Sequence, residues 1–216
     1  MQGRRVGIAV KNMQDETERL LQMSEYENRA RAAGFSAIAG IDEAGRGPLA
    51  GPVVAAAVIL PEACFLYGLN DSKKLTPKAR ERLYEQITQN AVAWGTGSAE
   101  PDEIDEINIL NAAKRSMARA VAALDLRPDC LLIDAITIPG ISIPQYPIIK
   151  GDALSVSIAA ASVVAKVTRD RIMEAYDARY PEYGFAKHKG YGTREHYAAL
   201  VKYGASPIHR LSFRLS

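Results

Sequence analysis

Four acidic residues stand beside apolar, strand-like segments of this sequence. Asp42 and Glu43 close the run AIAGIDE, Asp134 closes LLID, and Asp152 precedes a long run of small and apolar residues. Unpaired charges are costly on buried strands, so these carboxylates need a partner. An oxygen-only ligand set without nearby His or Cys favours Mg²⁺ or Mn²⁺ over zinc. The pattern therefore predicts a divalent metal site.

Each acid also has a purely structural interpretation. Asp152 could be a helix N-cap with Ser155 at the N3 position, and Asp134 could be a turn acid after a strand. The pair of Asp42 and Glu43 is harder to explain in this way. Adjacent residues of a regular strand point to opposite faces, so these two can share a site only if the strand bends or one contributes its backbone carbonyl.

The turn that follows the first two acids, GRGPLAG at residues 45–51, is rich in glycine. Its spacing is one residue longer than the common dinucleotide-binding fingerprint, and the next segment is β-rich rather than helical. These features argue against a Rossmann-type phosphate site. A tight turn with positive φ explains the glycines but not Arg46 between them. The accessible N–H groups of such a turn would let a ligand approach the main chain closely.

The elements that must position these residues predict an α/β domain with a mixed β-sheet flanked by helices. Strands are expected near 37–42 and 53–60 as an antiparallel pair, near 91–99, at 129–135 and, broken by prolines, at 141–152. Helices are expected over 13–33, from Pro77 onward with Thr76 as N-cap, over 101–124 and over 153–180. We divide the chain into an N-terminal helical extension (1–36), a main domain (37–180) and a C-terminal helical segment (181–216).

Composition limits the class of protein. The 216 residues are 48% hydrophobic, enough for one globular domain with a sizeable core. Cys64 and Cys130 lack metal-type spacing, and the N-terminal apolar stretch is too short for a signal peptide, so a cytoplasmic protein without membrane spans is expected. The net charge of +2 means that nucleic-acid binding would need a local patch. Residues 187–214 predict one, because basic residues, tyrosines and all three histidines interleave there.

Several blocks of the sequence together resemble the bacterial ribonuclease HII family, the type 2 ribonucleases H. They span residues 37 to about 200 in the family's order: GIDEAGRGPLAGPVV, LNDSKKLTPKARERL, LLIDA, KGDALSVSIAAASVVAKVTRDRIM and YGFAKHKGYGTREHYAAL. Arg46 between two glycines favours this family over its sister, ribonuclease HIII, whose turn typically differs. The first 36 residues lie outside the matching blocks.

The resemblance implies a ribonuclease H-like fold with a C-terminal helical segment. It implies an endoribonuclease that hydrolyses the RNA strand of RNA·DNA hybrids and nicks 5′ of ribonucleotides embedded in duplex DNA, leaving 3′-hydroxyl and 5′-phosphate ends. Ribonucleotide excision repair and RNA primer removal are the expected roles, and a monomer is the expected state. Two divalent ions, Mn²⁺ or Mg²⁺, would be held by Asp42, Glu43, Asp134 and Asp152.

The resemblance also implies residues that bind the nucleic acid. The ribonucleotide at the cut site would be sensed by Gly45, Arg46, Gly47 and Tyr191. Together with the basic tail, it predicts that the nucleic-acid backbone is held by Ser72, Lys73, Lys187, His188 and Lys189.

Three other functions stay open from the sequence. A resolvase or integrase nuclease of the same fold would use similar acids but would need no sensor of the 2′-hydroxyl. The glycine turn and Tyr191 would form such a sensor, so they argue against this alternative. A hybrid-binding module without catalysis would tolerate the loss of an acid, and none of the four is missing. A ribonuclease HIII-like enzyme would cleave long hybrids but not single embedded ribonucleotides.

Overall fold

The computed structural model describes the backbone of residues 2–215 and the side chains of residues 13–215, so Met1 and Ser216 of the two predicted terminal segments lie outside it. A sheet in the order β3-β2-β1-β4-β5 forms the centre of this part of the chain. Its strands are β1 (Ile38–Ala44), β2 (Val53–Ile59), β3 (Ala93–Ala99), β4 (Cys130–Asp134) and β5 (Gln145–Ile148). The pairs β1–β2 and β2–β3 are antiparallel, whereas β1–β4 and β4–β5 are parallel. The sheet is mixed, as predicted.

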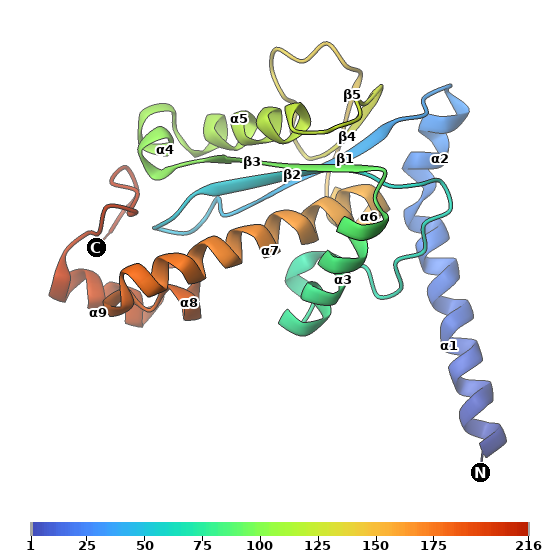
Figure 1. Cartoon of the computed structure of the whole chain (residues 1–216), viewed down its shortest axis with the longest axis horizontal. Helices are drawn as coiled ribbons and strands as arrows, with labels where there is room; N and C mark the ends of the chain where they lie inside the picture. The colour runs from blue at the N-terminus through green and yellow to red at the C-terminus, as the bar shows by residue number, and fades with distance from the viewer. Residues whose placement is uncertain (1, 216) are drawn as a thin grey trace.

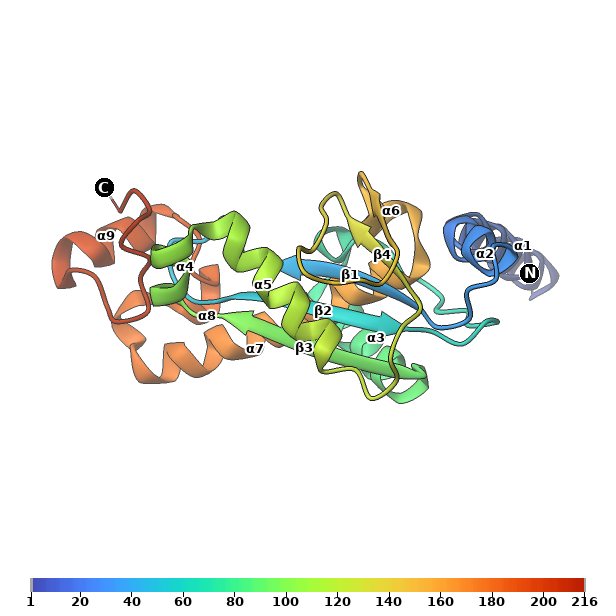
Figure 2. The ribbon, with the colours of Figure 1, turned by 90° about the horizontal axis from the view of Figure 1, so that it is seen from above.

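Helices cover both faces of the sheet and extend beyond two of its ends. They are α1 (Gln2–Met23), α2 (Glu25–Ala32), α3 (Pro77–Asn90), α4 (Pro101–Ile107), α5 (Ile109–Ala122), α6 (Gly151–Leu154), α7 (Val156–Arg179), α8 (Phe185–His188) and α9 (Arg194–Tyr203). Helices α4 and α5 lie over one face, and α3, α6 and α7 lie over the other (Figure 1). Seen from above, the N-terminal helices stand at one end and α8 and α9 at the opposite end (Figure 2).

The strand β2 lies in the middle of the core. All seven residues of its sequence VVAAAVI are buried, because α5 packs on one face of the sheet and α7 on the other. The backbone of β1 lies directly against α7 at Gly40, where a Cβ atom would come within 2.0 Å of the carbonyl carbon of Ser157. Glycine is therefore required at this position for the strand and the helix to meet.

Two predicted helices are each divided by a single polar residue. The predicted helix over 101–124 breaks at Asn108, which has a φ of 66° and accepts hydrogen bonds from the N–H groups of Leu110 and Asn111. The predicted helix over 153–180 breaks at Ser155, whose hydroxyl accepts from Ile158 N–H. In both cases the side chain caps the second helix, which a hydrophobic pattern does not reveal.

The second break corrects the N-cap interpretation of Asp152. This residue lies inside the short helix α6, whose N-cap position is taken by Lys150 with a φ of 59°. The N-cap that starts the long helix α7 is Ser155. The remaining boundaries shift modestly: the strand expected over 141–152 is confined to β5, and the helix expected over 13–33 is two helices that meet at Ser24. In the described part of the chain, no helix is long and apolar enough to span a bilayer.

Candidate active site

The four predicted acids come together at one edge of the sheet. Parallel pairing of β1 with β4 places Ile41 beside Ile133 and stops there, so Asp42 and Asp134 follow at the same edge. Asp152 lies in α6, directly after β5, which is the parallel neighbour of β4. Three segments that are distant in sequence therefore deliver carboxylates to one place, as expected from the carboxyl ends of neighbouring parallel strands.

Backbone hydrogen bonds hold two of these carboxylates. Asp134 Oδ1 accepts the N–H of Gly151 at 2.8 Å, which ties the first turn of α6 to the end of β4. Asp42 Oδ1 accepts the N–H of Glu43 at 2.7 Å. Of the two arrangements that would let Asp42 and Glu43 share a site, the bend is absent, because both residues continue the ladder with β2. The pairing with β4 ends just before them, which leaves this side of β1 open.

Burial and mutual repulsion raise the pKa values of three of the acids. Desolvation raises the pKa of Asp42 well above its ordinary value, and the charges of Glu43 and Asp134 raise it further. Burial also raises the pKa of Glu43, against the opposing effect of Arg46. The pKa of Asp152 is raised by burial and by nearby acids that include Asp134. These carboxylates are therefore close enough to destabilise one another's charged forms.

The donor atoms fit an oxygen-preferring divalent cation. Glu43 Oε2 is buried and has no hydrogen-bond partner among the described residues, while its Oε1 accepts from Arg46 at 3.3 Å. An orphaned buried carboxylate oxygen among repelling acids is the environment that a cation stabilises. In the described part of the chain, no group of three His, Cys, Asp or Glu side chains is placed closely enough to hold a metal ion without rearrangement. The four acids fit a divalent cation because they supply oxygen donors and lie at the same edge of the sheet, although they do not form a preformed ligand cage.

Lys73 lies beside the acids, whereas the side chain of Ser72 points into the protein. Desolvation lowers the pKa of Lys73, but the charges of Asp42, Asp71 and other nearby acids outweigh this effect and the net pKa is raised. The hydroxyl of Ser72 is buried and lies 2.8 Å from that of Ser162 on α7. This hydroxyl is thus not placed at the surface, where the predicted contact with a nucleic-acid backbone would be made.

The glycine turn and Tyr191 meet although 144 positions separate Gly47 from the tyrosine. A Cβ atom on Gly47 would lie 3.7 Å from Cε1 of Tyr191, and the N–H of Leu49 donates to the carbonyl of Gly190 at 2.8 Å. Gly45 has a φ of 99°, as a tight turn next to β1 requires. Tyr191 is 44% exposed. The predicted sensor residues therefore form one surface next to Glu43.

Two buried arginines, which no sequence motif marks as site residues, hold this turn. Arg210 is fully buried and donates to four carbonyl groups at 2.6–3.1 Å, those of Gly45, Arg46, Pro48 and Gly51. Arg169 is 1% exposed and donates to the carbonyls of Ala50, Pro52 and Lys189 at 2.9–3.0 Å. Burial lowers the pKa of Arg169 to about 10 and that of Arg210 to about 9, so both stay protonated at neutral pH.

Sequence spacing could not identify these two arginines. In the sequence, Arg169 is one of several charged residues of the long predicted helix over 153–180, and Arg210 is one of several basic residues in 187–214. The one available signal is the turn itself, because the carbonyl groups of a mostly buried loop need hydrogen-bond donors. Nothing in the sequence says which distant residues supply them.

The three histidines form an internal chain rather than a surface. Gly190 N–H donates to Nδ1 of His188, whose Nε2 donates to the carbonyl of Tyr183 at 2.7 Å. His196 Nδ1 donates to the carbonyl of Tyr191 at 2.9 Å, and its Nε2 accepts from Nε2 of His209 at 2.9 Å. The ring of His188 is buried, so it is not placed to contact a phosphate directly. The chain instead supports the loop that carries Tyr191.

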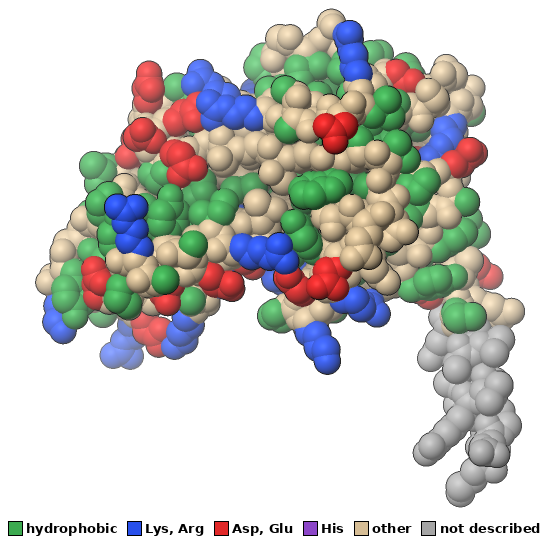
Figure 3. All heavy atoms as spheres, viewed as in Figure 1, with side chains coloured by type: hydrophobic (Ala, Val, Ile, Leu, Met, Phe, Trp, Pro, Cys, Tyr) green, Lys and Arg blue, Asp and Glu red, His purple; other side chains and the backbone are tan. Residues whose placement is uncertain are grey.

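The lysines on either side of His188 differ in exposure. The side chain of Lys187 is 73% exposed and pairs with Glu195 at 2.5 Å, whereas that of Lys189 is 17% exposed and pairs with Glu174 at 2.7 Å. Figure 3 shows basic and acidic side chains interleaved along the lower edge of the molecule, over α3, α8 and α9. The predicted basic patch is therefore a mixed surface, on which Lys187 is one of the exposed basic side chains.

Comparison with known proteins identifies the family. The family model described as Ribonuclease HII matches residues 39–216 of this chain. A curated Ribonuclease HII from Ruminiclostridium cellulolyticum is 56% identical over 205 residues, which are 94% of this chain and 80% of the relative. The chain belongs to the ribonuclease HII family. As a ribonuclease HII, it is a metal-dependent endoribonuclease that acts on RNA–DNA hybrids.

Solved structures confirm the fold of this ribonuclease HII. The crystal structure of ribonuclease H2 from Pyrococcus horikoshii OT3 matches with a TM-score of 0.69 and 29% identity over 83% of this chain and 95% of that one. A ribonuclease HII from Archaeoglobus fulgidus, solved in complex with PCNA, matches with a TM-score of 0.69 and 27% identity over 84% of this chain and 96% of that one. The predicted ribonuclease H-like fold is therefore confirmed.

Proposed function

We propose that this ribonuclease HII nicks duplex DNA on the 5′ side of a single embedded ribonucleotide, in addition to hydrolysing the RNA strand of longer hybrids. The observation that carries this proposal is the closeness of Gly47 to the ring of Tyr191, which would lie 3.7 Å from a Cβ atom at that position, beside Arg46, which pairs with Glu43. A surface built from a glycine turn and an aromatic ring beside the carboxylates can test one sugar at the position of the cut. Such an enzyme would serve ribonucleotide excision repair and RNA primer removal.

The chemistry follows from the acids. Asp42, Glu43, Asp134 and Asp152 would hold two Mg²⁺ or Mn²⁺ ions. These ions would supply an activated water and charge stabilisation for the leaving oxygen, as an in-line displacement that gives 3′-hydroxyl and 5′-phosphate ends requires. The chain's own part is to bring these carboxylates together in spite of their repulsion. Asp134 is held by Gly151 N–H, and Lys73 offsets part of the negative charge beside Asp42.

Recognition of the ribonucleotide rests on the turn. The 2′-hydroxyl is the group that distinguishes RNA from DNA at a single position. A glycine turn lets backbone groups approach this hydroxyl, and Tyr191 can stack under the sugar next to it. Because Arg210 donates hydrogen bonds to the carbonyl groups of Gly45 and other residues of the turn, the orientation of the turn is fixed before substrate binds.

The nucleic-acid backbone would lie along the exposed and semi-exposed basic groups. For the phosphate contacts we propose Lys73 beside the acids together with Lys187 and Lys189, which would exchange their partners Glu195 and Glu174 for phosphate groups. Such contacts position the duplex without reading its sequence. The monomeric state and cytoplasmic location expected from the sequence stay predictions.

Replacement of the sensor tyrosine tests the proposal. Tyr191→Ala should lower cleavage at a single embedded ribonucleotide by at least about tenfold, as expected for the loss of about 1.4 kcal/mol of stacking. Tyr203→Ala is a matched control, because Tyr203 is 48% exposed on α9, away from the glycine turn. Both variants are compared with the wild type on a duplex with one ribonucleotide and on a long hybrid.

The three possible outcomes separate the hypotheses. If cleavage at the single ribonucleotide falls in Tyr191→Ala but not in Tyr203→Ala, the sensor role of Tyr191 is supported. Unchanged cleavage at that position in Tyr191→Ala overturns it. A wild-type enzyme that cuts long hybrids but not single ribonucleotides would instead be ribonuclease HIII-like in specificity.

A further inference from the structure

A buried carboxylate from the N-terminal extension lies at the start of α7. Glu27 of α2 is 3% exposed, and it precedes residue 39, where the match to the family model begins. Its Oε1 accepts from the hydroxyl of Ser155 at 2.5 Å, from the hydroxyl of Ser157 at 2.5 Å and from the N–H of Ser157 at 3.0 Å. Its Oε2 is buried without a hydrogen-bond partner among the described residues. A carboxylate this deeply buried is costly unless it is hydrogen-bonded, and here all three donors are gathered on one of its two oxygens.

The residue that Glu27 binds joins the two helices next to the site. Ser155 has extended backbone angles between α6, which carries Asp152, and α7. Its N–H donates to the carbonyl of Gly151, and its hydroxyl accepts from Ile158 N–H while donating to Glu27. The hydroxyl is thus fixed as both donor and acceptor. A carboxylate at this end of α7 is also favoured by the helix dipole.

The same turn of α7 contacts the strand that carries Asp42. The backbone of Ser157 lies against Gly40, two residues before Asp42, in a contact too close for a Cβ atom. Further along α7, the hydroxyl of Ser162 lies beside the Asp42 carboxyl. The first turns of α7 therefore set the separation between β1 and α6, and hence between Asp42 and Asp152.

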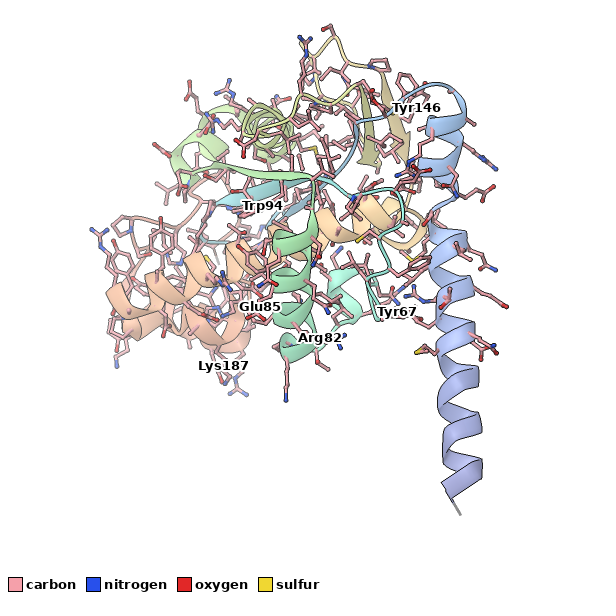
Figure 4. All side chains as sticks on the ribbon, turned by 45° about the vertical axis from the view of Figure 1, so that its right-hand side comes forward. Tyr67, Arg82, Glu85, Trp94, Tyr146 and Lys187 are labelled. Atoms are coloured by element: carbon pink, nitrogen blue, oxygen red, sulfur yellow. The ribbon has the colours of Figure 1, made fainter. Side chains whose placement is uncertain are left out.

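The extension itself is fastened to the main domain, so Glu27 reaches this turn from a fixed support. Leu20 is buried in the core that α7 shares. Glu16 Oε1 accepts from Gly68 N–H at 2.8 Å, and Arg19 donates to the carbonyl of Leu69 at 2.6 Å. Figure 4 shows Tyr67 of the same loop beside α1. This loop leads directly to the DSKKL segment.

We propose that Glu27 is a positioning residue of the active site. It holds the break between α6 and α7 through Ser155 and Ser157, and so holds Asp152 at the distance from Asp42 and Asp134 that ion binding needs. This inference rests on the proposed role of the four acids as metal ligands. It makes the N-terminal extension part of the catalytic architecture rather than an appendage.

Removal of the carboxylate should weaken metal binding. In the full chain, Glu27→Ala should lower the affinity for Mn²⁺, measured by calorimetry without substrate, by about tenfold or more, as is usual when groups that support metal ligands are lost. The activity of the variant should recover at high Mn²⁺, with the KM for hybrid little changed. Glu25→Gln is the matched control, because Glu25 lies on the same helix, pairs with Arg29 and is 60% exposed.

A purely structural role predicts a different result. If Glu27→Ala lowers only the melting temperature and leaves the Mn²⁺ affinity equal to that of Glu25→Gln, the proposal is wrong. If Glu27→Ala does not fold, Ser157→Ala serves instead, because it removes one of the three hydrogen bonds and keeps the carboxylate. Wild-type Mn²⁺ affinity in that variant would overturn the proposal equally.

The same titration distinguishes this inference from the proposed function. Asp152→Asn must lose Mn²⁺ affinity if the four acids are the metal ligands. Loss in Asp152→Asn with wild-type affinity in Glu27→Ala would reject the positioning role alone. Wild-type affinity in Asp152→Asn would reject the assigned metal site, and the positioning role with it.

Discussion

At the scale of single residues, buried polar side chains decide how the recognition surface is held. His209 illustrates this, because its Nδ1 accepts from the N–H of Ser206 at 2.8 Å and its Nε2 donates to His196. The next residue, Arg210, binds the glycine turn. Both ring nitrogens of His209 are used in the neutral form, so an added proton on Nδ1 would remove an acceptor inside the protein.

The histidine chain makes stability depend on pH. Burial lowers the pKa of His209 from 6.5 to about 4, so the unfolded chain binds a proton at pH values where the native state does not. The free energy of unfolding should therefore fall as the pH drops from about 6.5 to about 4, with a contribution from His209 of up to about 3 kcal/mol. Urea unfolding of the metal-free protein at pH 7 and pH 4.5 measures this loss.

A variant isolates the contribution of this one ring. His209→Gln should be less stable at pH 7 but should lose less stability on acidification than the wild type. The raised pKa values of Asp42, Glu43 and Asp152 work in the opposite direction, because these acids bind protons in the native state first. They are present in both proteins and cancel in the comparison. Parallel profiles for the two proteins would contradict the assignment.

At the scale of elements, the glycine turn is held by residues from two distant segments. Arg169 comes from α7, and Arg210 comes from the chain after α9. Together they donate hydrogen bonds to carbonyl groups of residues 45–52. Arg169 also donates to the carbonyl of Lys189, which fixes the turn against the loop that carries Tyr191. The turn is therefore rigid in spite of its glycines.

Loss of one clamp should affect recognition of the ribonucleotide. Arg210→Lys keeps the charge but cannot reach four carbonyls in the planar geometry of a guanidinium group. We expect cleavage at a single ribonucleotide to fall by about tenfold or more, with a smaller loss on long hybrids, where many registers can be cut. Arg214→Lys is the control, because Arg214 is exposed near the C-terminus. Equal losses on both substrates would show that Arg210 serves stability rather than the turn.

The elements differ in how far the sequence predicts them. The strands β1, β2 and β4 and the start of α3 at Thr76 are confirmed, because apolar runs and a capping residue are local signals. The breaks at Asn108 and Ser155 were missed, since each depends on one polar side chain that caps the following helix. Tertiary context decides such breaks, and the hydrogen bond from Ser155 to Glu27 is an example.

In the candidate site too, some features could be predicted from the sequence and others depend on tertiary context. Convergence of the four acids could be predicted from strand ends, and contact of the turn with Tyr191 from family resemblance. The buried state of His188 and Ser72 could not be predicted, because both look like ordinary polar residues in a basic segment. Arg169 and Arg210 were missed since their partners are backbone carbonyls far away in the chain.

At the scale of the whole molecule, the sheet edge with its acids stands between two supports. The N-terminal helices lie at one end of the sheet, and the C-terminal helices with the Tyr191 loop lie at the other (Figure 2). Glu27 comes from the first support and binds Ser155 and Ser157 between α6 and α7, and Arg210 comes from the second and binds the glycine turn. The proposed catalytic acids and the proposed recognition turn are thus supported from opposite ends of the sheet and adjoin at Asp42 and Glu43.

Cleavage of a labelled DNA duplex that carries one ribonucleotide tests this account most directly. The wild type is compared with Asp134→Asn, in Mg²⁺, in Mn²⁺ and with chelator. The account predicts a metal-dependent nick 5′ to the ribonucleotide, no cut in all-DNA duplex, and a loss of at least about a hundredfold in a folded Asp134→Asn variant. Wild-type turnover in Asp134→Asn, or cleavage that persists in chelator, would contradict it.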